Sequence, residues 1–442
     1  MPRTAVETED LVMLCICDYS GQVRGKGFPA SELPARLKSG MGLAPTNLMI
    51  NAFGEIGDSP WGPRGELIML PDPTTKVRVD FGESRPSEQF FLADITELDG
   101  TPWTCCPRGW LARGLQALWD EFGLTIKAAF EHEFHYSGAE ARLGDSYLLD
   151  AIRLQDSFAQ TLMPALRANG IEPDTFLPEY GPQQYEVTCK PSLGLTAADD
   201  AVKLREITRA VARYHGHKAT FSPIMAQGAI GNGVHVHFCP LDQDGTPVCF
   251  DACATLGISA TAEYFIEGIL SEMPALLALT APSVISYERL QPNQWSATYN
   301  NLGNLDREAG IRLCPISSLP DSNPAEDFNF EYRAADAAAN PYMVLGVLVW
   351  AGLRGLREEA PLRKLTDRDP GDMSAAERKS QGLVRLPQCL SDALEFFAES
   401  TLLEKSMGAE FRDAYLMHKR SEISFLEDYT SEARITRYVN AY

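Results

Sequence analysis

The sequence predicts an α+β protein with two parts, a β-rich domain over residues 1–102 and a larger domain over residues 103–442. Two observations support this division. Before residue 103 the apolar residues lie in short extended runs, whereas Pro107 opens the first segment with apolar residues every three to four positions. Beyond that segment, helical patterns alternate with strands that carry polar residues on one face.

Short strands account for the first part. Leu11–Cys17 and Val23–Phe28 flank Asp18-Tyr-Ser-Gly21, a turn sequence typical of a β-hairpin. Further extended runs follow at Glu66–Leu70, Val77–Phe81 and Gln89–Asp94.

The second part begins with a helix over Gly109–Phe122. The pattern then predicts, in order, a strand over Lys127–Tyr136, a helix at about 153–168, a strand over Tyr185–Lys190, a helix at about 197–215, a strand over Gly233–Cys239, a helix at about 252–278 and a strand over Phe328–Arg333. Asn340-Pro341 opens a buried apolar helix that reaches Leu353. After residue 355, the charged helical segments predict a surface or intersubunit layer: Ala375–Lys379, Ser391–Glu404 and Ala409–Leu426.

Composition excludes several classes of protein. The 442 residues are 45% hydrophobic and 22% charged, which is typical of globular domains, and the net charge of −21 disfavours nucleic acid and anionic membranes as partners. The longest apolar run is too short to span a bilayer. The acidic start, residues 1–10, lacks the order of a secretory signal, so we expect a cytoplasmic protein whose ten dispersed cysteines are reduced and mostly buried.

Four of the predicted strands place polar side chains on one face and apolar side chains on the other. Residues two apart share a face of a strand, so these polar side chains would line one cavity. The polar faces carry Glu131, Glu133 and His135; Glu186 and Thr188; His235 and His237; and Asn329, Glu331 and Arg333. Carboxylates clustered in this way repel one another unless a cation compensates them.

The residue types indicate metal-dependent phosphoryl transfer. Carboxylates in excess of imidazole, without thiolate, favour Mg²⁺ or Mn²⁺ over zinc; the candidate ligands are Glu131, Glu133, Glu179, Glu186, His235 and Glu331. Guanidinium groups suit phosphate oxygens and a substrate carboxylate; the candidates are Arg289, Arg307, Arg312 and Arg333. A solvated strand edge and histidines satisfied in a core would give some of the same patterns, but repetition in four strands favours the cavity.

Several motifs, taken in the order in which they occur along the chain, resemble the glutamine synthetase family, and the resemblance covers nearly the whole chain. They are Glu131-His-Glu133, Glu179-Tyr-Gly-Pro-Gln-Gln-Tyr-Glu186, Gly231-Asn-Gly-Val-His-Val-His237, Arg289-Leu-Gln-Pro292, Arg307 with Arg312, and Glu331-Tyr-Arg333. The resemblance implies an N-terminal β-grasp domain and a catalytic domain whose antiparallel sheet forms an open polar funnel flanked by helices. It also implies two stacked rings of subunits with active sites between neighbours.

The resemblance further implies a role for each site residue. Two or three Mg²⁺ or Mn²⁺ ions would be held by Glu133, Glu179 and Glu186, and by Glu131, His235 and Glu331. L-Glutamate would be bound by Glu133, Gly231, His235, Arg289 and Arg333. ATP would be contacted by His237, Cys239, Asn329, Arg307 and Arg312, and the four arginines Arg289, Arg307, Arg312 and Arg333 would stabilise the reacting groups.

Two departures from the family pattern concern the nitrogen substrate. Trp295 stands six residues after Arg289, where the family has a flap glutamate that helps to deprotonate ammonium. The acidic Asp-Gly-Ser-Ser loop is also absent, since residues 51–58 read Asn-Ala-Phe-Gly-Glu-Ile-Gly-Asp. An indole offers apolar area and a π-face to a larger amine.

The resulting hypothesis is a γ-glutamylamide synthetase, an ATP-dependent ligase that joins glutamate to an organic amine. Trp295, Glu179 and Tyr147 would form the amine pocket, and the missing charges disfavour polyamines relative to amines with a neutral body. Two alternatives stay open: an ammonia-dependent glutamine synthetase, in which Glu288, Glu55 or Asp58 replaces the flap glutamate, and a non-catalytic structural or regulatory member of the family.

Overall fold

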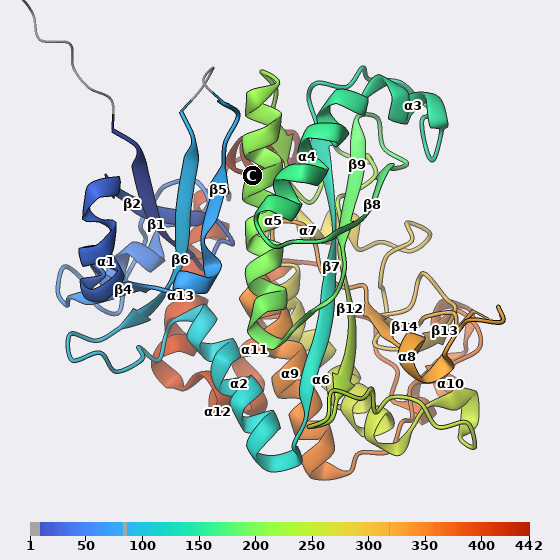
Figure 1. Ribbon diagram of the computed structural model, residues 1–442. Coiled ribbons are helices and arrows are strands. Elements are labelled where there is room, and N and C mark those ends of the chain that lie inside the picture. Colours follow the sequence, from blue (N-terminus) through green and yellow to red (C-terminus); the bar gives the residue numbers. More distant parts are fainter. Residues whose placement is uncertain (1–8, 83–85, 318) are drawn as a thin grey trace, which may run out of the picture.

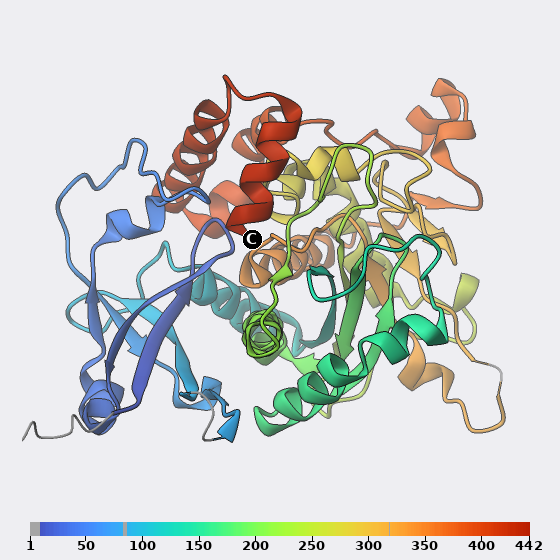
Figure 2. The same ribbon diagram turned by 90° about the horizontal axis from the view of Figure 1, so that it is seen from above.

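A computed structural model describes residues 9–82, 86–317 and 319–442. The acidic start that we read as lacking a secretory signal lies mostly in residues 1–8, outside the described residues. Two β-sheets flank the long helix α5 (Gly194–Tyr214), which separates the N-terminal sheet from the larger sheet (Figures 1 and 2). The α+β fold class predicted from the sequence is confirmed.

The N-terminal sheet has six strands in the order β2-β1-β6-β4-β3, with β5 paired to β6. Strands β1 and β6 are parallel, and the other pairs are antiparallel. Every strand predicted in this region is present, and β3 and a short helix are additional. The bounds are β1 Leu11–Cys17, β2 Val23–Pro29, α1 Leu33–Ser39, β3 Met41–Leu43, β4 Leu67–Pro71, β5 Val77–Val79 and β6 Glu88–Thr96.

The second sheet has ten strands in the order β16-β13-β14-β15-β12-β7-β9-β8, with β10 and β11 paired to β7. From β14 to β8 neighbouring strands are antiparallel, whereas β13 runs parallel to β14 and β16. The bounds are β7 Thr125–Tyr136, β8 Pro173–Pro178, β9 Gln184–Cys189, β10 Ser192–Leu193, β11 Ala219–Thr220, β12 Val234–Leu241, β13 Leu302–Asn304, β14 Ile311–Leu313, β15 Phe330–Tyr332 and β16 Leu365–Thr366.

Helices pack against the apolar side of this sheet, α5 and α2 directly on β7, and form the apolar interior with it (Figure 1). Their bounds are α2 Pro107–Phe122, α3 Leu149–Leu154, α4 Asp156–Ala168, α6 Ala260–Thr280, α7 Ser286–Arg289, α8 Pro324–Asp327, α9 Pro341–Glu358, α10 Ala375–Gln381, α11 Leu390–Glu399, α12 Thr401–Met407, α13 Ala409–Phe425 and α14 Ser431–Ala441. Within the described residues, no helix combines the length and apolar character that crossing a membrane requires. All ten cysteines are free thiols, and only Cys253 and Cys389 are exposed.

Three predicted helices differ from those observed, and local backbone signals explain two of the differences. The helix expected at 252–278 begins at Ala260, because the Ser259 hydroxyl accepts from the amide of Ala262 and caps the first turn. The helix expected over Ser391–Glu404 is divided at Ser400, whose hydroxyl caps α12 through the amide of Leu403. The helix expected at 153–168 is two helices, which meet at Gln155.

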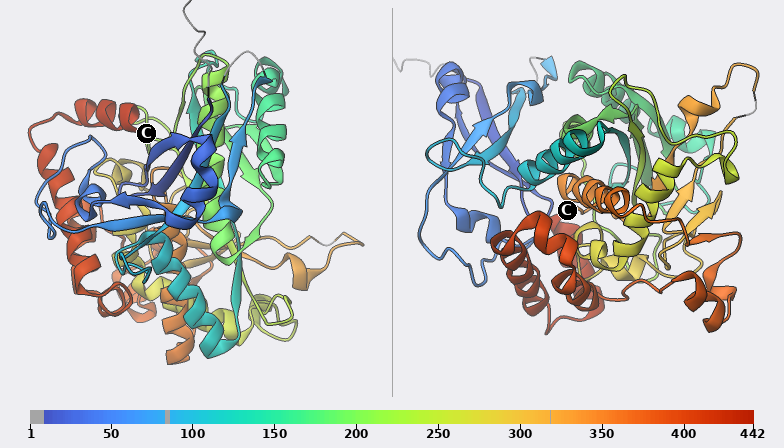
Figure 3. Two further views of the ribbon diagram at one scale, coloured as in Figure 1. Left: turned by 60° about the vertical axis from the view of Figure 1, so that its left-hand side comes forward. Right: turned by 90° about the horizontal axis from the view of Figure 1, so that it is seen from below.

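The prediction of an outer layer after residue 355 is wrong for the inner face of α13. Phe411 and Tyr415 are fully buried, and the Tyr415 hydroxyl donates to the carbonyl of Ala278 over 2.6 Å. Helix α11 packs against α6 in the same region. Figure 3 shows these C-terminal helices packed against the remainder of the chain. This segment is highly charged, but it also contributes buried residues to the core of the molecule.

A buried arginine joins the two parts of the molecule. Arg205 on α5 is fully buried and donates to the carbonyls of Gly21, Ala337 and Ala339 at 2.7, 3.1 and 3.1 Å. Gly21 has φ +76° and lies so close to the loop after β15 that a Cβ there would stand 2.2 Å from the carbonyl oxygen of Ala338. The β1–β2 turn is thus fixed to the loop that follows β15.

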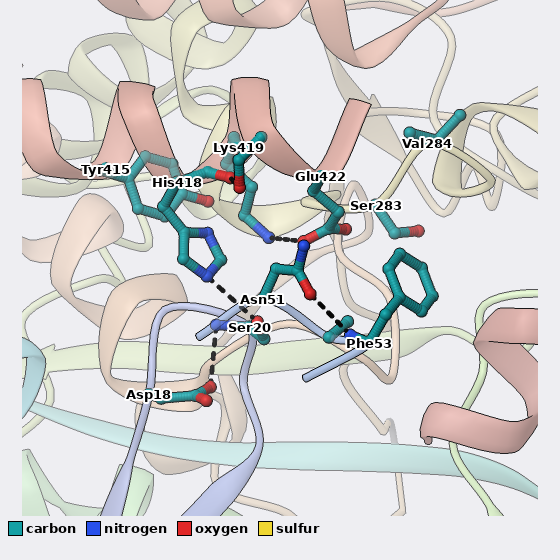
Figure 4. Close-up of polar contacts among 12 residues, drawn as sticks. Asp18, Ser20, Asn51, Phe53, Ser283, Val284, Tyr415, His418, Lys419 and Glu422 are labelled. Carbon is teal, nitrogen blue, oxygen red and sulfur yellow. Dashed lines mark hydrogen bonds and ion pairs between the residues drawn. The ribbon is translucent and has the colours of Figure 1, made fainter. Parts of the chain in front are cut away.

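A second junction is a buried polar cluster beneath α13 (Figure 4). Lys419 and Glu422 are fully buried and form an ion pair at 3.3 Å, and the Tyr438 hydroxyl donates to Glu422 over 2.6 Å. His418 Nε2 lies 3.3 Å from the hydroxyl of Ser20 in the β1–β2 turn. Two opposite charges are therefore buried between α13, α14 and the N-terminal part.

Candidate active site

The four strands with polar faces are neighbours in the second sheet, in the order β15-β12-β7-β9. Their register sets polar residues opposite one another in pairs: His237 with Glu331, His235 with Glu131, and Glu133 with Glu186. Along β7, Glu131, Glu133 and His135 are partly exposed, whereas the residues between them are buried. The polar side chains of four distant segments thus face one side of the sheet.

Glu331 is the most deeply buried carboxylate of this site, with 1% of its surface exposed. Arg312 on β14 and Arg333 after β15 both form ion pairs with it. Burial opposes ionisation of Glu331, but the two arginines and His237 outweigh burial and hold its pKa below the usual value. Glu331 is therefore a fixed negative charge among cations.

The other carboxylates surround a neutral imidazole. One ligand atom each from Glu131, Glu186 and His235 lies within 4.8 Å of the others. Burial and the nearby arginines hold the pKa of His235 well below its usual range, so its ring is neutral and able to ligate a metal. The resemblance had divided these residues between two ions, whereas here they form one cluster.

Glu133 and Glu179 complete the carboxylate set. Glu133 accepts from the amide of Gly233 over 2.8 Å and from the side chain of Gln184 over 3.2 Å. Glu179 follows β8 and lies close enough to Glu133 for the two charges to repel. Oxygen-rich donors with one imidazole suit Mg²⁺ or Mn²⁺, so the residues present fit the hard divalent ions that the resemblance implies.

Electrostatics support the need for such a cation. Burial and then the charges of neighbouring carboxylates raise the pKa of Glu186 to about 10, and burial and Glu133 raise that of Glu179 to about 7. Both groups therefore hold protons that a divalent cation would displace.

The stability of the protein should depend on pH through Glu179. Its folded pKa of about 7 exceeds the ordinary 4.5, so between these values the metal-free folded state binds more protons than the unfolded chain. Stability without metal should therefore fall as the pH rises through this range, and Mg²⁺ should raise the unfolding temperature more at about pH 8 than at about pH 5.5. Thermal unfolding with chelator or Mg²⁺ measures this. Glu179→Gln should reduce the difference between the Mg²⁺-induced shifts in unfolding temperature at the two pH values. Equal shifts at both pH values in the wild type would contradict this prediction.

Arg289 lies at the base of the carboxylate cluster. It is buried, donates to the carbonyl of Ala335 over 3.0 Å, and its Nη2 lies 3.5 Å from Nε2 of His235. A Cβ at Gly231 or Gly233 would stand 2.6 or 2.4 Å from its side chain. The absence of a side chain at these two glycines thus leaves room for the side chain of Arg289.

The candidate ATP contacts are brought together only in part. His237 Nδ1 lies 2.8 Å from Asn329 Oδ1, and its Nε2 lies 3.3 Å from Glu131. Cys239, however, is 3% exposed, and its thiol contacts Cys249 over 3.4 Å instead of facing the cluster. Arg307 is exposed, whereas Arg312 is buried.

Trp295 lies on a loop held by polar contacts to its backbone. Its φ is +52°, its amide donates to Glu308 over 2.9 Å, and its carbonyl accepts from Arg333 over 3.0 Å. The indole packs edge-on against Tyr180 with ring centroids 5.2 Å apart, and the guanidinium of Arg307 lies 5.9 Å from the indole centroid.

Tyr147 continues this aromatic group, with its ring 5.7 Å from that of Tyr180. Sequence reasoning missed Tyr180 and Glu308. Tyr180 directly follows Glu179 in a motif already recognised, so its place in that motif could have identified it as a site residue. Nothing in the sequence marks Glu308. Of the acids considered as replacements for the flap glutamate, Glu288 accepts from Ser431 on α14.

The fold and site together define a metal-dependent ligase site, in which a carboxylate cluster and arginines bring anionic substrates together. Comparison with known proteins agrees. A glutamine synthetase catalytic-domain model matches residues 104–438, and a glutamine synthetase N-terminal-domain model matches residues 2–103. The chain belongs to the glutamine synthetase family, whose members are ATP-dependent ligases acting on glutamate and an amine or ammonia.

Its relatives include enzymes with different nitrogen substrates. The gamma-glutamylpolyamine synthetase GlnA3 of Streptomyces coelicolor is 31% identical, covering 94% of this chain and 90% of its own. The glutamine synthetase of Thermococcus kodakarensis is 30% identical, and the match covers 96% of this chain and 91% of that protein. The crystal structure of a novel glutamine synthase homolog superposes with a TM-score of 0.91 at 36% identity, covering 99% of this chain and 100% of the other. GmaS in complex with ADP shares the fold at 24% identity and superposes with a TM-score of 0.81. The match covers 96% of this chain and 95% of the GmaS chain.

Proposed function

We propose that this protein is a γ-glutamylamide synthetase that joins L-glutamate to an organic amine and produces ADP and phosphate. The observation that supports it most is the aromatic group of Tyr147, Tyr180 and Trp295 beside Glu179. Their exposed fractions are 58%, 44% and 51%, so three large aromatic side chains remain partly open to solvent next to the carboxylate cluster. Exposed aromatic groups of this kind suit an apolar or cationic ligand.

The proposed reaction has two steps. The γ-carboxylate of glutamate attacks the terminal phosphorus of ATP and releases ADP, and the amine nitrogen then displaces phosphate from the acyl phosphate to give the amide. Bound divalent ions, two or three in this proposal, would neutralise the charge between the two anions. Glu131, Glu133, Glu179, Glu186, His235 and Glu331 would hold them.

Within this proposal the chain's own groups orient the substrates. Arg289 and Arg333 would receive the carboxylate groups of glutamate, with Gly231 beside them. Arg307 and Arg312 would bind phosphate oxygens, with His237 and Asn329 nearby. Glu179, as well as holding a divalent ion, would line the amine pocket with Trp295 and Tyr147, and the proton that the attacking amine releases would pass to solvent. The geometry supports Cys239 less, because its thiol is turned to Cys249.

The proposal extends to assembly and location. We propose a cytoplasmic homo-oligomer of stacked rings with the N-terminal domain, residues 1–102, contributing to the site of a neighbouring subunit. The resemblance to the family supports this arrangement.

Phosphate release with ATP, Mg²⁺ and L-glutamate tests the function across a panel of amines. The panel contains ammonium and alkyl, hydroxyalkyl, polyamine and aromatic amines, with products identified by mass. Turnover with an organic amine and little with ammonium is the expected result. Preference for ammonium would make the protein a glutamine synthetase, and release of no phosphate with any amine would favour a non-catalytic member.

Changing Trp295 should alter the choice of amine. Trp295→Ala should lower kcat/KM for the best organic amine by about 10-fold, mainly through KM, because an aromatic contact contributes about 1–1.5 kcal/mol. Trp295→Glu should in addition improve the use of ammonium, since a carboxylate attracts a small cation. Steady-state kinetics with both amines measure this. The matched control is Trp119→Ala, which removes an exposed indole on α2, and an equal loss in both variants would contradict the assignment.

A further inference from the structure

Beside the oxygen-rich cluster lies a second group of donors with different chemistry. One ligand atom each from His237, Cys314 and Glu331 lies within 4.8 Å of the others. Cys314 is 6% exposed and Glu331 is 1% exposed, so these donors are mostly shielded from water. The set offers nitrogen, sulfur and oxygen, whereas the cluster around Glu186 offers no sulfur.

The spacing of these donors matches tetrahedral coordination. The Sγ of Cys314 lies 3.6 Å from Nδ1 of His237. Zinc bonds of about 2.3 Å to sulfur and about 2.0 Å to nitrogen, at the tetrahedral angle, place the two ligand atoms about 3.5 Å apart. The separation of this pair is therefore close to that of two ligands of one zinc ion.

The backbone holds the donors in place from three adjacent strands. His237 on β12 is the register partner of Glu331 on β15, and Cys314 directly follows β14. The amide of Cys314 donates to the carbonyl of Asn329 over 3.2 Å, which fixes the position of the thiol beside β15. The site is thus part of the sheet and does not depend on a long loop.

Surrounding groups orient the ligands in the way that metal sites require. Asn329 Oδ1 accepts from Nδ1 of His237 over 2.8 Å and holds the ring in place, so Nδ1 would release this proton to solvent when it ligates a metal. The ionised carboxylate of Glu331 can accept from Arg312 and Arg333 and still offer a lone pair, because it has about four acceptor positions. Ligation at Nδ1 would replace its 2.8 Å contact to Asn329.

We propose that His237, Cys314 and Glu331 form a binding site for a thiophilic divalent ion, with Zn²⁺ as the best fit. Cys314 releases its S–H proton to solvent when the ion binds, and a solvent molecule or an anion takes the fourth position. Thiolate coordination selects Zn²⁺ over Mg²⁺. The ion shares Glu331 with the proposed magnesium cluster, so Zn²⁺ here would hinder that cluster and inhibit the ligase at the end where ATP is proposed to bind.

Cobalt binding tests the site without relying on activity. Co²⁺ replaces Zn²⁺ and gives a thiolate charge-transfer absorption in the near ultraviolet only when sulfur is a ligand. Titration of the metal-free protein, with Mg²⁺ in excess, should produce this band, and Zn²⁺ should abolish it. The band should disappear in Cys314→Ser and persist in Cys239→Ser and Cys253→Ser. No band in the wild type, or a band retained in Cys314→Ser, would overturn the proposal.

Protection of the wild-type thiol provides a second test that does not require a variant to fold. Zn²⁺ should slow the alkylation of Cys314 by iodoacetamide at least 10-fold, as measured from its peptide by mass spectrometry, and should leave alkylation of the exposed Cys253 unchanged. Equal rates at Cys314 with and without Zn²⁺ would overturn the proposal. Both readouts measure binding, so they stand even if the amine panel shows no ligase activity.

Discussion

Replacing Glu331 with glutamine should lower the rate of ATP-dependent amide formation by about 100- to 1,000-fold, the loss typical when a preorganised charge in a catalytic site is removed. Glu331 is a proposed metal ligand and at the same time separates Arg312 from Arg333, with which it forms ion pairs. The neutral amide would leave two guanidinium groups without their shared partner. The rate loss should therefore appear in kcat as well as in the Mg²⁺ concentration required, and steady-state kinetics at several Mg²⁺ concentrations measure both.

The matched control for this substitution is Glu395→Gln on α11, an exposed position far along the chain from the cluster. It removes the same charge and should retain the wild-type rate. Circular dichroism on both variants establishes that the fold is kept. A Glu331→Gln protein that folds normally and keeps more than about a tenth of the rate would contradict the role given to Glu331.

Replacing Lys419 with methionine should lower the free energy of unfolding by about 3–5 kcal/mol, the usual cost of removing one partner from a buried ion pair. Lys419 and Glu422 are both fully buried, and the Glu422 carboxylate also accepts from the Tyr438 hydroxyl over 2.6 Å. The variant keeps the volume of the side chain but leaves the charge of Glu422 uncompensated. Urea unfolding followed by circular dichroism gives the change.

Two further variants separate this cause from general loss of packing. Lys405→Met changes an exposed lysine on α12 and should leave stability within about 0.5 kcal/mol of the wild type. The double variant Lys419→Met with Glu422→Leu removes both charges and should recover most of the loss, since a buried pair can often be exchanged for apolar residues at little cost. A double variant as unstable as Lys419→Met would contradict the electrostatic explanation.

The polar strands could be predicted from the sequence because side chains alternate with a period of two whatever the strand pairs with. Glu131 and Glu133 were assigned to one face of β7 on that ground. The pairing itself could not be derived in this way. That His235 stands opposite Glu131, and Glu133 opposite Glu186, depends on register between segments about 50 to 100 residues apart, which no local pattern encodes.

Contacts made by loops were the least predictable. Trp295 was recognised as a departure from the family, but its partners Tyr180 and Glu308 come from separate loops that meet only in the folded chain. Cys314 was assigned to the buried thiols and nothing more, because a single cysteine gives no sign of the histidine beside it. Helix α14 was not predicted either, although its buried residues Ile435 and Tyr438 are spaced three apart, as on one face of a helix.

The fixed turn at Gly21 has a consequence for engineering and for gene fusion. Arg205 donates to the carbonyls of Gly21, Ala337 and Ala339, so the position of the turn fixes the position of the loop after β15. That loop also supplies the Ala335 carbonyl to Arg289. The N-terminal sheet is therefore not an interchangeable module. A chimera that carries a foreign sheet would need a turn of the same length and left-handed backbone, or Arg289, which we propose to bind glutamate, would lose its alignment.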